Sequence, residues 1–385
     1  MFNFYKINGY IYNKISNKNL FINQKYQEKI LEEVYKENFQ ENYFSRSYCQ
    51  YLCQKKLYKQ NYIFLNFISF FLIKLILVFF KIFQKKIIKE EKVKVLYFGI
   101  EKTIPKEFSH YEKKKLENHL FFTKKDIEYF ENDILKKSKK EYYFALKVLL
   151  KIAIYRYNIE KYSPEIFLVT SEYSWTSSIL TEFCEKNKIL HINYMHGNKW
   201  YVIRDSFFKF HKCYVWDEHY AEIFCKLKAF EGQFEVIDYL DFIPQINIEI
   251  KELYNTYYLQ IDETEDEVDQ IIIILEKLRL KTGYKGKIRC HPVYTPQKIK
   301  NKIPKEMLDE EENIYHSIVK SNYLISKYST VLYEAFVMKK GIVVIDDITK
   351  GIEKYNSLKE LGWVSGYKPH LMLSEIIKEG SVWII

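Results

Sequence analysis

Residues 189–197 read ILHINYMHG, a short apolar and β-branched run that ends in a polar turn with a glycine. Strand-like runs of the same kind occur on both sides of it, namely VKVLYFGI (93–100), EIFLVTSE (165–172) and KCYVWDE (212–218). Residues 172–187, between two of these runs, have Ser and Thr near their start and continue with a helical middle. Alternation of strands and helices is typical of a parallel sheet with right-handed crossovers. We therefore expect a doubly wound α/β domain over residues 91–245.

A second series of the same type follows the segment FEVIDYLDFIPQ (234–245). Its predicted elements are a strand, a helix, two strands, a helix and a strand, at residues 255–262, 266–283, 285–292, 321–328, 329–341 and 342–347. The sequence thus predicts a second doubly wound domain over residues 246–385, with a hinge between Asp241 and Tyr254. We expect the two domains to face each other across a cleft.

The net charge of the chain indicates which classes of partner it can bind. Its 385 residues are enough for two ordinary cores, and its formal net charge is +10. Such an excess favours phosphates, nucleic acids or an anionic membrane. Between residues 55 and 94 there are ten lysines against two acids, Glu90 and Glu91, and these lysines flank the most apolar stretch of the chain. Because they do not alternate with aromatic residues and no zinc or RNP motif is present, we expect a membrane surface, and no nucleic acid, as a partner.

The apolar stretch YIFLNFISFFLIKLILVFFKIF (62–83) is long enough, as a helix, to approach the thickness of a bilayer. Its polar residues fall within an arc of about 140° when plotted on a helix, and they are Asn66, Ser69, Lys74, Lys81 and Gln84. A lysine in mid-span is costly in hydrocarbon, so we expect the helix to lie in the membrane interface with its lysines toward water. Docking on the body of the protein through the wide apolar face, and a true span, are the alternatives.

Residues 1–90 as a whole are predicted to form a helical accessory segment, with a helix from about Asn23 to Tyr58 ahead of the apolar one. The six cysteines show no CxxC pair, and the N-terminus shows no signal-peptide core. These features predict reduced thiols in a cytoplasmic protein that is peripheral to the inner membrane through residues 62–86.

Polar residues at the carboxyl ends of strands are the candidates for chemistry, because ligands of doubly wound sheets bind there. The turn after the strand 189–194 contains His196, whose imidazole can take a proton at neutral pH, and Gly197, which lets the backbone approach a ligand closely. We predict His196 as the general base, and Gly197, Asn198 and Lys199 as contacts to an acceptor or a phosphate. A plain turn with a surface histidine is the alternative.

Another predicted strand, residues 285–292, ends in His291 and Pro292. Proline stops the strand and fixes the direction in which the chain departs, so that His291 is held at the rim, where a ring nitrogen can donate to a phosphate. We predict His291 as a ligand of the donor phosphate, with an ordinary loop start as the alternative.

The third candidate is the segment 326–330, between a predicted strand and a predicted helix. A helix N-terminus carries unpaired N–H groups and a partial positive charge, and the hydroxyls of Ser326, Ser329 and Thr330 can add donors to a bound phosphate. Glu334, in the helix that follows, is in a position to reach a ribose hydroxyl. Plain N-capping by Ser329 or Thr330 is the alternative.

Together, the HG turn, the HP pair and the SxYST segment before a helix with Glu334 resemble bacterial two-domain (GT-B) transferases of surface polysaccharides, over about residues 92–365. In sialyltransferases that use CMP-activated sugars, a His-Pro motif and a Ser/Thr motif hold CMP, which implies that role for His291, Pro292, Ser329 and Thr330. The acidic base motif of that branch is absent, and His196-Gly197 stands in its place. CDP-glycerol glycerophosphotransferases are similar in another way, because their His-Gly and Tyr-Ser-Ser-like motifs match His196, Gly197, Tyr328, Ser329 and Thr330.

The resemblance implies a GT-B-like, metal-independent, inverting glycosyltransferase of capsule or lipopolysaccharide synthesis. It would move a sugar from a cytidine-activated donor, foremost CMP-sialic acid or a related CMP-sugar, to a glycan acceptor. A CDP-glycerol-type polyol-phosphate transferase is the alternative within the group, and a non-catalytic membrane-associated scaffold is the alternative from another class.

No metal or other cofactor is expected. The acidic run IDETEDEVD (261–269) is typical of a helix start, where acids interact with the helix dipole, and Asp346-Asp347 lacks the DxD form of metal-dependent transferases. Asp217 and Glu218 follow a strand and either position the acceptor at the cleft mouth or cap a helix, and we favour capping.

Overall fold

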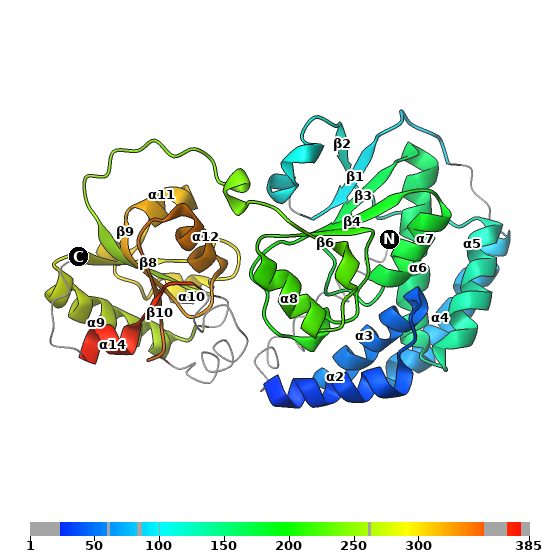
Figure 1. The fold of residues 1–385 in the computed structure, drawn as a ribbon, viewed down its shortest axis with the longest axis horizontal. Helices are drawn as coiled ribbons and strands as arrows, with labels where there is room; N and C mark the ends of the chain where they lie inside the picture. The colour runs from blue at the N-terminus through cyan, green and yellow to red at the C-terminus, as the bar shows by residue number, and fades with distance from the viewer. Residues whose placement is uncertain are drawn as a thin grey trace. The chain divides into compact units, whose positions relative to one another are not determined.

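The computed structural model describes residues 24–59, 62–82, 87–99, 101–260, 263–349 and 368–378. Contacts within the chain divide it into two compact units (Figure 1). Unit 1 comprises Met1–His196 and Tyr201–Asp238, and unit 2 comprises Gly197–Trp200 and Tyr239–Ile385. The main division thus falls between Asp238 and Tyr239, ahead of the predicted hinge, and the short segment after His196 belongs by its contacts to unit 2.

Unit 1 is built on a six-stranded parallel sheet in the order β2-β1-β3-β4-β5-β6. Its strands are β1 (Val95–Phe98), β2 (Lys113–Lys115), β3 (Ile166–Val169), β4 (Leu190–Tyr194), β5 (Lys212–Val215) and β6 (Phe234–Val236). The four predicted strands form its centre, and the sequence analysis missed β2 and β6 at the edges. The order 2-1-3-4-5 is that of a doubly wound sheet whose strand order reverses between β1 and β3.

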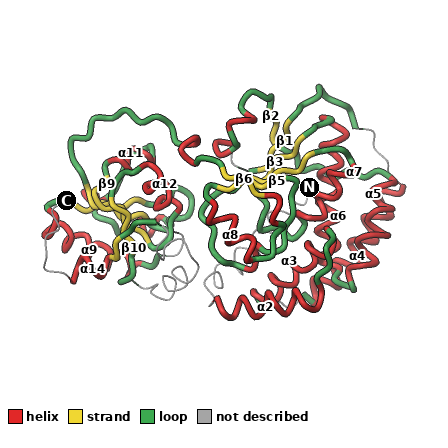
Figure 2. Tube along the Cα trace, viewed as in Figure 1, coloured by secondary structure: helices red, strands yellow, loops and turns green. Residues whose placement is uncertain are grey.

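Alternate residues of β3 bury on opposite faces of this sheet. Phe167 belongs to a large core with Phe144 of α6 and Ile179 of α7, whereas Leu168 packs in a second core with Val95 and Tyr194. A strand buried on both faces needs a continuous apolar run, which is the pattern that the sequence shows. The helices that surround the sheet in Figure 2 are α2 (Gln24–Asn38), α3 (Tyr43–Leu57), α4 (Ile63–Ile82), α5 (Lys124–Tyr129), α6 (Tyr142–Tyr162), α7 (Ser177–Lys186) and α8 (Glu218–Lys226).

Short turns of 3-10 or π helix join these elements. They are η1 (Glu101–Thr103), η2 (Lys106–Phe108), η3 (Phe130–Leu135), η4 (Lys136–Ser138), η5 (Ile203–Asp205) and η6 (Glu231–Gln233) in unit 1, with η7 (Tyr239–Phe242) and η8 (Lys305–Met307) in unit 2.

The described N-terminal helices are an integral part of unit 1, which differs from the predicted accessory segment. The single helix predicted from Asn23 to Tyr58 is two helices, because Asn42 accepts a hydrogen bond from the backbone N–H of Ser45 at 2.8 Å and so caps α3. The side chain of Gln50 on α3 donates to the carbonyl oxygens of Glu172 at 2.7 Å and Arg204 at 2.9 Å. These bonds fasten α3 to the loop that follows β3.

Helix α4 faces α6 with its polar side, which corrects the predicted orientation. The side-chain amide of Asn66 donates to Glu141 at 3.0 Å and its oxygen accepts from the backbone N–H of Tyr143 at 2.8 Å. Ser69 and Ile73 are each only 2% exposed. The hydrogen-bonding partners at the start of α6 hold Asn66 inward, and Ser69 is buried on the same side, so the apolar side of the helix faces outward. Lys74 is exposed as predicted, whereas the side chains of Lys81 and Gln84 lie outside the described residues.

Unit 2 is built on a five-stranded parallel sheet in the order β11-β10-β9-β7-β8. Its strands are β7 (Tyr254–Tyr258), β8 (Lys285–Arg289), β9 (Ser321–Ser326), β10 (Ile342–Ile345) and β11 (Leu371–Met372). Its helices are α9 (Glu265–Thr282), α10 (Gln297–Lys300), α11 (Ile314–Val319), α12 (Thr330–Met338) and α14 (Leu373–Lys378). When it is read from β8 to β11, this strand order matches that of unit 1. The point at which the strand order reverses therefore lies between β7 and β9.

The predicted elements of unit 2 are all present. Helix α9 begins with a capping box between Thr264 and Glu267 and ends at Gly283, whose φ of +76° is the left-handed conformation that suits glycine. Gly286 in β8 is required for close packing, because an added Cβ would lie 2.7 Å from the Cβ of Leu275 on α9. Both units are therefore doubly wound parallel α/β structures, as predicted, and the cleft stays a prediction.

Candidate functional site

The reversal point of unit 2 lies between the carboxyl ends of β7 and β9, and the predicted hydroxyl segment begins there. The hydroxyl of Ser326, the last residue of β9, donates to the carbonyl oxygen of Tyr258 at 2.9 Å. It also accepts from the side-chain amide of Gln260 at 3.0 Å. Ser326 therefore ties the two strand ends together, and its predicted contact with a donor stays a prediction.

The next residues form the start of α12. Ser329 is the N-cap, and its hydroxyl accepts from the backbone N–H of Val331 at 3.3 Å, as the capping alternative predicted. The hydroxyl of Thr330 accepts from the backbone N–H of Asn198 at 3.3 Å, and the amide of Asn198 donates to the carbonyl oxygen of Ser329 at 3.4 Å. The structure thus brings two of the predicted motifs together within unit 2.

Gly197 has a backbone conformation that suits glycine. Its φ is +116°, a region that side chains disfavour, and an added Cβ would lie 3.5 Å from the hydroxyl oxygen of Thr330. That distance is an ordinary van der Waals contact, so the backbone conformation, and not the closeness of a neighbour, is what favours glycine here. The predicted close approach of the backbone to a ligand stays a prediction. Lys199, in the same segment, is only 6% exposed.

His291 follows β8, the neighbour of β7 on the side opposite β9. Its Nδ1 accepts from the backbone N–H groups of Val293 and Tyr294, each at 3.2 Å. Burial lowers the pKa of His291, so the ring is neutral and, with Nδ1 as an acceptor, its proton is on Nε2. Because parallel strands end at one edge of a sheet, His291 after β8 and the start of α12 after β9 lie on either side of the end of β7.

Three charged residues near this edge were missed by the sequence analysis. Lys327, inside the predicted hydroxyl segment, pairs with Glu267 of α9 at 3.0 Å, and both side chains are buried. Although burial raises the pKa of Glu267, hydrogen bonds from Thr264 and Lys327 lower it overall. The lysine is therefore a structural partner of α9. A second buried acid, Glu263, accepts from the backbone N–H of Gln260 at 2.8 Å, and burial raises its pKa.

Glu334 lies on α12 as predicted, about one turn after its start. Its carboxylate accepts from the hydroxyl of Tyr239 at 2.9 Å, and burial raises its pKa. This bond fastens η7 to α12. The predicted contact of Glu334 with a ribose stays a prediction.

In unit 1, His196 has a carboxylate partner that the sequence analysis did not name. Its Nδ1 lies 3.5 Å from the Oε1 of Glu172, which is fully buried, while the His196 side chain is 28% exposed. Glu172 follows β3 and His196 follows the adjacent strand β4, so the pair sits at the carboxyl edge of the sheet. The two side chains come together because β3 and β4 are neighbours in the sheet. Glu172 is the last residue of the run EIFLVTSE, so its place at a strand end was visible in the sequence. A carboxylate on one ring nitrogen leaves the other, Nε2, as a proton acceptor.

Asp217 caps α8, the alternative that we favoured. Its carboxylate accepts from the backbone N–H of His219 at 3.0 Å. A role of Asp217 toward an acceptor stays a prediction.

Helix α6 carries two half-buried lysines, one turn apart, that the sequence analysis also missed. The Lys147 ammonium lies 3.6 Å from the centroid of the Trp175 ring, and burial, aided by the charge of Lys151, lowers its pKa to about 7. Burial lowers the pKa of Lys151 to about 8. Lys151 and Ser171 line a cavity of about 10 Å³ at the reversal point of unit 1, which has room for no more than a water molecule.

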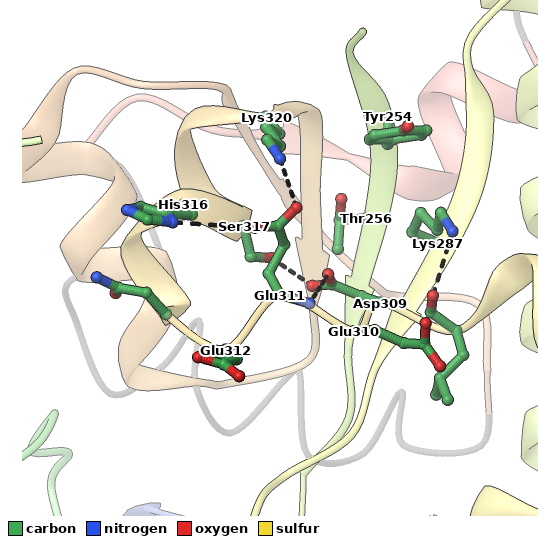
Figure 3. A pocket seen from close by; sticks show the side chains of 12 residues that line it. Tyr254, Thr256, Lys287, Asp309, Glu310, Glu311, Glu312, His316, Ser317 and Lys320 are labelled. Carbon is green, nitrogen blue, oxygen red and sulfur yellow. Dashed lines mark hydrogen bonds and ion pairs between the residues drawn. The ribbon is translucent and has the colours of Figure 1, made fainter. Parts of the chain in front are cut away.

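A larger cavity of about 490 Å³ lies away from these strand ends (Figure 3). Tyr254, the first residue of β7, lines it, so it lies toward the amino edge of the sheet. Two of the four acids that line it have partners: Glu311 pairs with Lys320 at 2.5 Å, and Asp309 accepts from Ser317 at 2.5 Å (Figure 3). We assign no ligand to this cavity.

Comparisons with known proteins give only distant likenesses. No family model and no curated protein matches the sequence. Similar solved structures include a UDP co-structure of MnaA from S. aureus, with a TM-score of 0.41, 8% identity and coverage of 66% of this chain and 79% of that chain. A putative UDP-N-acetylglucosamine 2-epimerase from Listeria monocytogenes has a TM-score of 0.41, 13% identity and coverage of 69% and 82%.

A CDPG-soaked variant of the wall teichoic acid polymerase TagF has a TM-score of 0.39, 13% identity and coverage of 77% of this chain and 81% of that chain. At such scores and identities these likenesses carry no functional argument. The argument depends on the residues at the carboxyl edges of the two sheets.

Proposed function

We propose that this chain is a glycosyltransferase that moves a sugar from a cytidine-nucleotide-activated donor, foremost a CMP-sugar such as CMP-sialic acid, to a hydroxyl of a glycan acceptor. The observation that carries the proposal is the carboxyl edge of the sheet in unit 2, where the start of α12 and His291 lie on either side of the end of β7. The motif resemblance to cytidine-dependent GT-B transferases supports the choice of nucleotide.

The donor half of the proposal rests on anion chemistry. The first turn of a helix favours a phosphate through its N–H groups and dipole, and the Thr330 hydroxyl and a neutral His291 add polar contacts. As the bond between the sugar and the nucleotide breaks, the leaving phosphate gains negative charge. Fixed donors aimed at that charge stabilise the transition state.

The acceptor half rests on the His196–Glu172 pair. In this mechanism the Glu172 carboxylate, 3.5 Å from Nδ1, stabilises the imidazolium cation that forms when Nε2 takes the proton of the acceptor hydroxyl. The acceptor oxygen then forms its bond to the anomeric carbon while the nucleotide departs with the electron pair of the broken bond. One attack of this kind inverts the anomeric centre.

A second candidate, transfer of a polyol phosphate from a CDP-polyol, is favoured by one specific observation. The segment Gly197–Asn198 is hydrogen-bonded to Ser329 and Thr330, so the His-Gly and Tyr-Ser-Thr motifs typical of that branch adjoin within the fold. In this reaction the acceptor oxygen would attack phosphorus and CMP would leave.

The test is turnover with each donor. Purified protein is given CMP-sialic acid or CDP-glycerol with oligosaccharide acceptors, and product is measured for wild type, His196→Ala and the control His110→Ala, which changes an exposed histidine. We expect His196→Ala to lose at least about 10²-fold in rate, as for a general base, while the control keeps its activity. Unchanged turnover in His196→Ala would remove the base from the mechanism, and no turnover with either donor would favour the non-catalytic scaffold.

A further inference from the structure

Helix α4 exposes a broad apolar face on unit 1. Phe64, Phe67, Leu75 and Val78 are 71%, 63%, 66% and 57% exposed. The segment Ile63–Phe80 has a mean hydropathy of 2.6 and only 17% of it is buried, so by length and composition it could cross a membrane. Scattered exposed apolar residues are common on proteins, but a contiguous face of this kind marks an interaction surface.

The way α4 is held argues against a span. Asn66 is hydrogen-bonded to the side chain of Glu141 and to the backbone of Tyr143, at the start of α6. Ile73 and Leu77 are 2% and 7% exposed and belong to the main core of unit 1. Crossing a bilayer would separate these groups from their partners and place an amide and a lysine in hydrocarbon. The helix therefore keeps one side on α6 and offers the other, lengthwise, to a partner.

Lysines adjoin this face. Lys136, Lys137, Lys139 and Lys140 are all exposed in the segment just before α6. The following residue, Glu141, bonds to Asn66, so this basic segment lies beside the N-terminal half of α4. Asp133 pairs with Lys137 at 3.2 Å and Lys55 pairs with Glu141, which leaves the segment positive.

Lys74 fits the same arrangement. It is exposed within the apolar helix, and its ammonium lies 4.2 Å from the centroid of the Phe70 ring. Its long alkyl chain can lie along apolar surroundings while the charge reaches a polar layer.

We propose that α4 and the basic segment 136–140 dock unit 1 on an anionic bilayer surface, with the axis of α4 in the plane of the membrane. The exposed phenylalanines and leucines would enter the boundary between head groups and acyl chains, and the lysines would contact lipid phosphates. A second copy of the chain is a poorer partner, because the lysines beside the face would oppose one another in a symmetric contact.

The experiment is flotation of the full chain with vesicles of phosphatidylcholine alone or with one quarter phosphatidylglycerol, at low and high salt. We expect binding to the anionic vesicles at low salt, weaker binding at high salt and little binding to the neutral vesicles. Phe64→Gln with Leu75→Gln should reduce binding at least ten-fold, because both residues are exposed and the core is untouched. Replacing the four lysines by Gln should reduce it by about five-fold per lysine.

The matched control is Ile273→Gln with Leu280→Gln on α9, which removes two residues that are 55% and 77% exposed in unit 2. It should bind vesicles as wild type does. No flotation with anionic vesicles at low salt would overturn the proposal, and so would equal flotation of the α4 variant and wild type with unchanged circular dichroism. Sedimentation that shows a dimer lost in the α4 variant, without vesicle binding, would assign the face to a second copy instead.

Discussion

The buried ion pair between Lys327 and Glu267 allows a test of what stabilises the carboxyl edge of the sheet in unit 2. Lys327 lies inside the segment 326–330 that we propose binds a phosphate, so it could be taken for a phosphate ligand. Its side chain, however, is 4% exposed and pairs at 3.0 Å with a carboxylate that is 7% exposed. Lys327→Met leaves Glu267 charged and buried. Breaking a buried pair in this way costs about 3–5 kcal/mol of unfolding free energy.

Helix α9, which carries Glu267, also has an ion pair at the surface that serves as a control. Lys298 lies 3.3 Å from Glu265, and the two side chains are 71% and 48% exposed. Lys298→Met should therefore cost less than about 1 kcal/mol. The double change Lys327→Met with Glu267→Gln removes both charges and keeps an acceptor for the backbone of Thr264, so it should recover much of the loss.

The assay is urea denaturation followed by circular dichroism, together with nucleotide binding by calorimetry on the folded variants. We expect a large loss of stability in Lys327→Met and unchanged affinity for nucleotide per folded molecule. A loss below about 1 kcal/mol would show that the pair is not a buried one in solution. Stability retained with binding abolished would make Lys327 a phosphate ligand.

Three further predictions follow from other contacts. Glu172→Gln should lower turnover by about 10²-fold in a stopped assay while donor affinity is kept, because it acts through His196, and equal loss of affinity would contradict this role. Gly197→Ala should cost about 1–2 kcal/mol in a thermal melt because its φ is +116°, and an unchanged melting temperature would show that the segment relaxes. Burial, then the charges of His211 and Lys151, lower the pKa of His191 to about 3. Its contribution to stability is thus complete above about pH 6.5 and falls by about 1.4 kcal/mol per pH unit toward pH 3, a slope that denaturation at pH 7, 5.5 and 4.5 should show in wild type and not in His191→Gln.

The centres of both sheets could be predicted from the sequence because buried parallel strands need unbroken apolar runs. Of the four edge strands in the described sheets, β8 was predicted, whereas β2, β6 and β11 were not. β2 is the run Lys113–Lys115, which carries no apolar signal, and β11 has only two residues. Edge strands are commonly short or charged, so their pairing depends on the neighbouring strand more than on their own composition.

The remaining differences between prediction and structure arise from contacts between residues that are far apart in the sequence. The polar arc of α4 was visible in the sequence, but which way it faces is decided by Glu141 and Tyr143, more than seventy positions away from Asn66. His196 was predicted from its strand end, whereas its partner Glu172 becomes evident only when β3 and β4 are placed side by side. Ser329 was predicted both as a phosphate ligand and as a cap, and the structure shows the cap.

The central claim is that the carboxyl edge of unit 2 holds the phosphate of a cytidine nucleotide. Calorimetric titration of CMP, CDP, UDP and GDP into wild type, His291→Ala, Thr330→Ala and the control His316→Ala, which alters the other cavity, tests it most directly. We predict that a cytidine nucleotide binds in preference to the others, that each of the first two variants loses about ten-fold or more, and that the control matches wild type. Absence of nucleotide binding, or equal binding by His291→Ala and wild type, would contradict the claim.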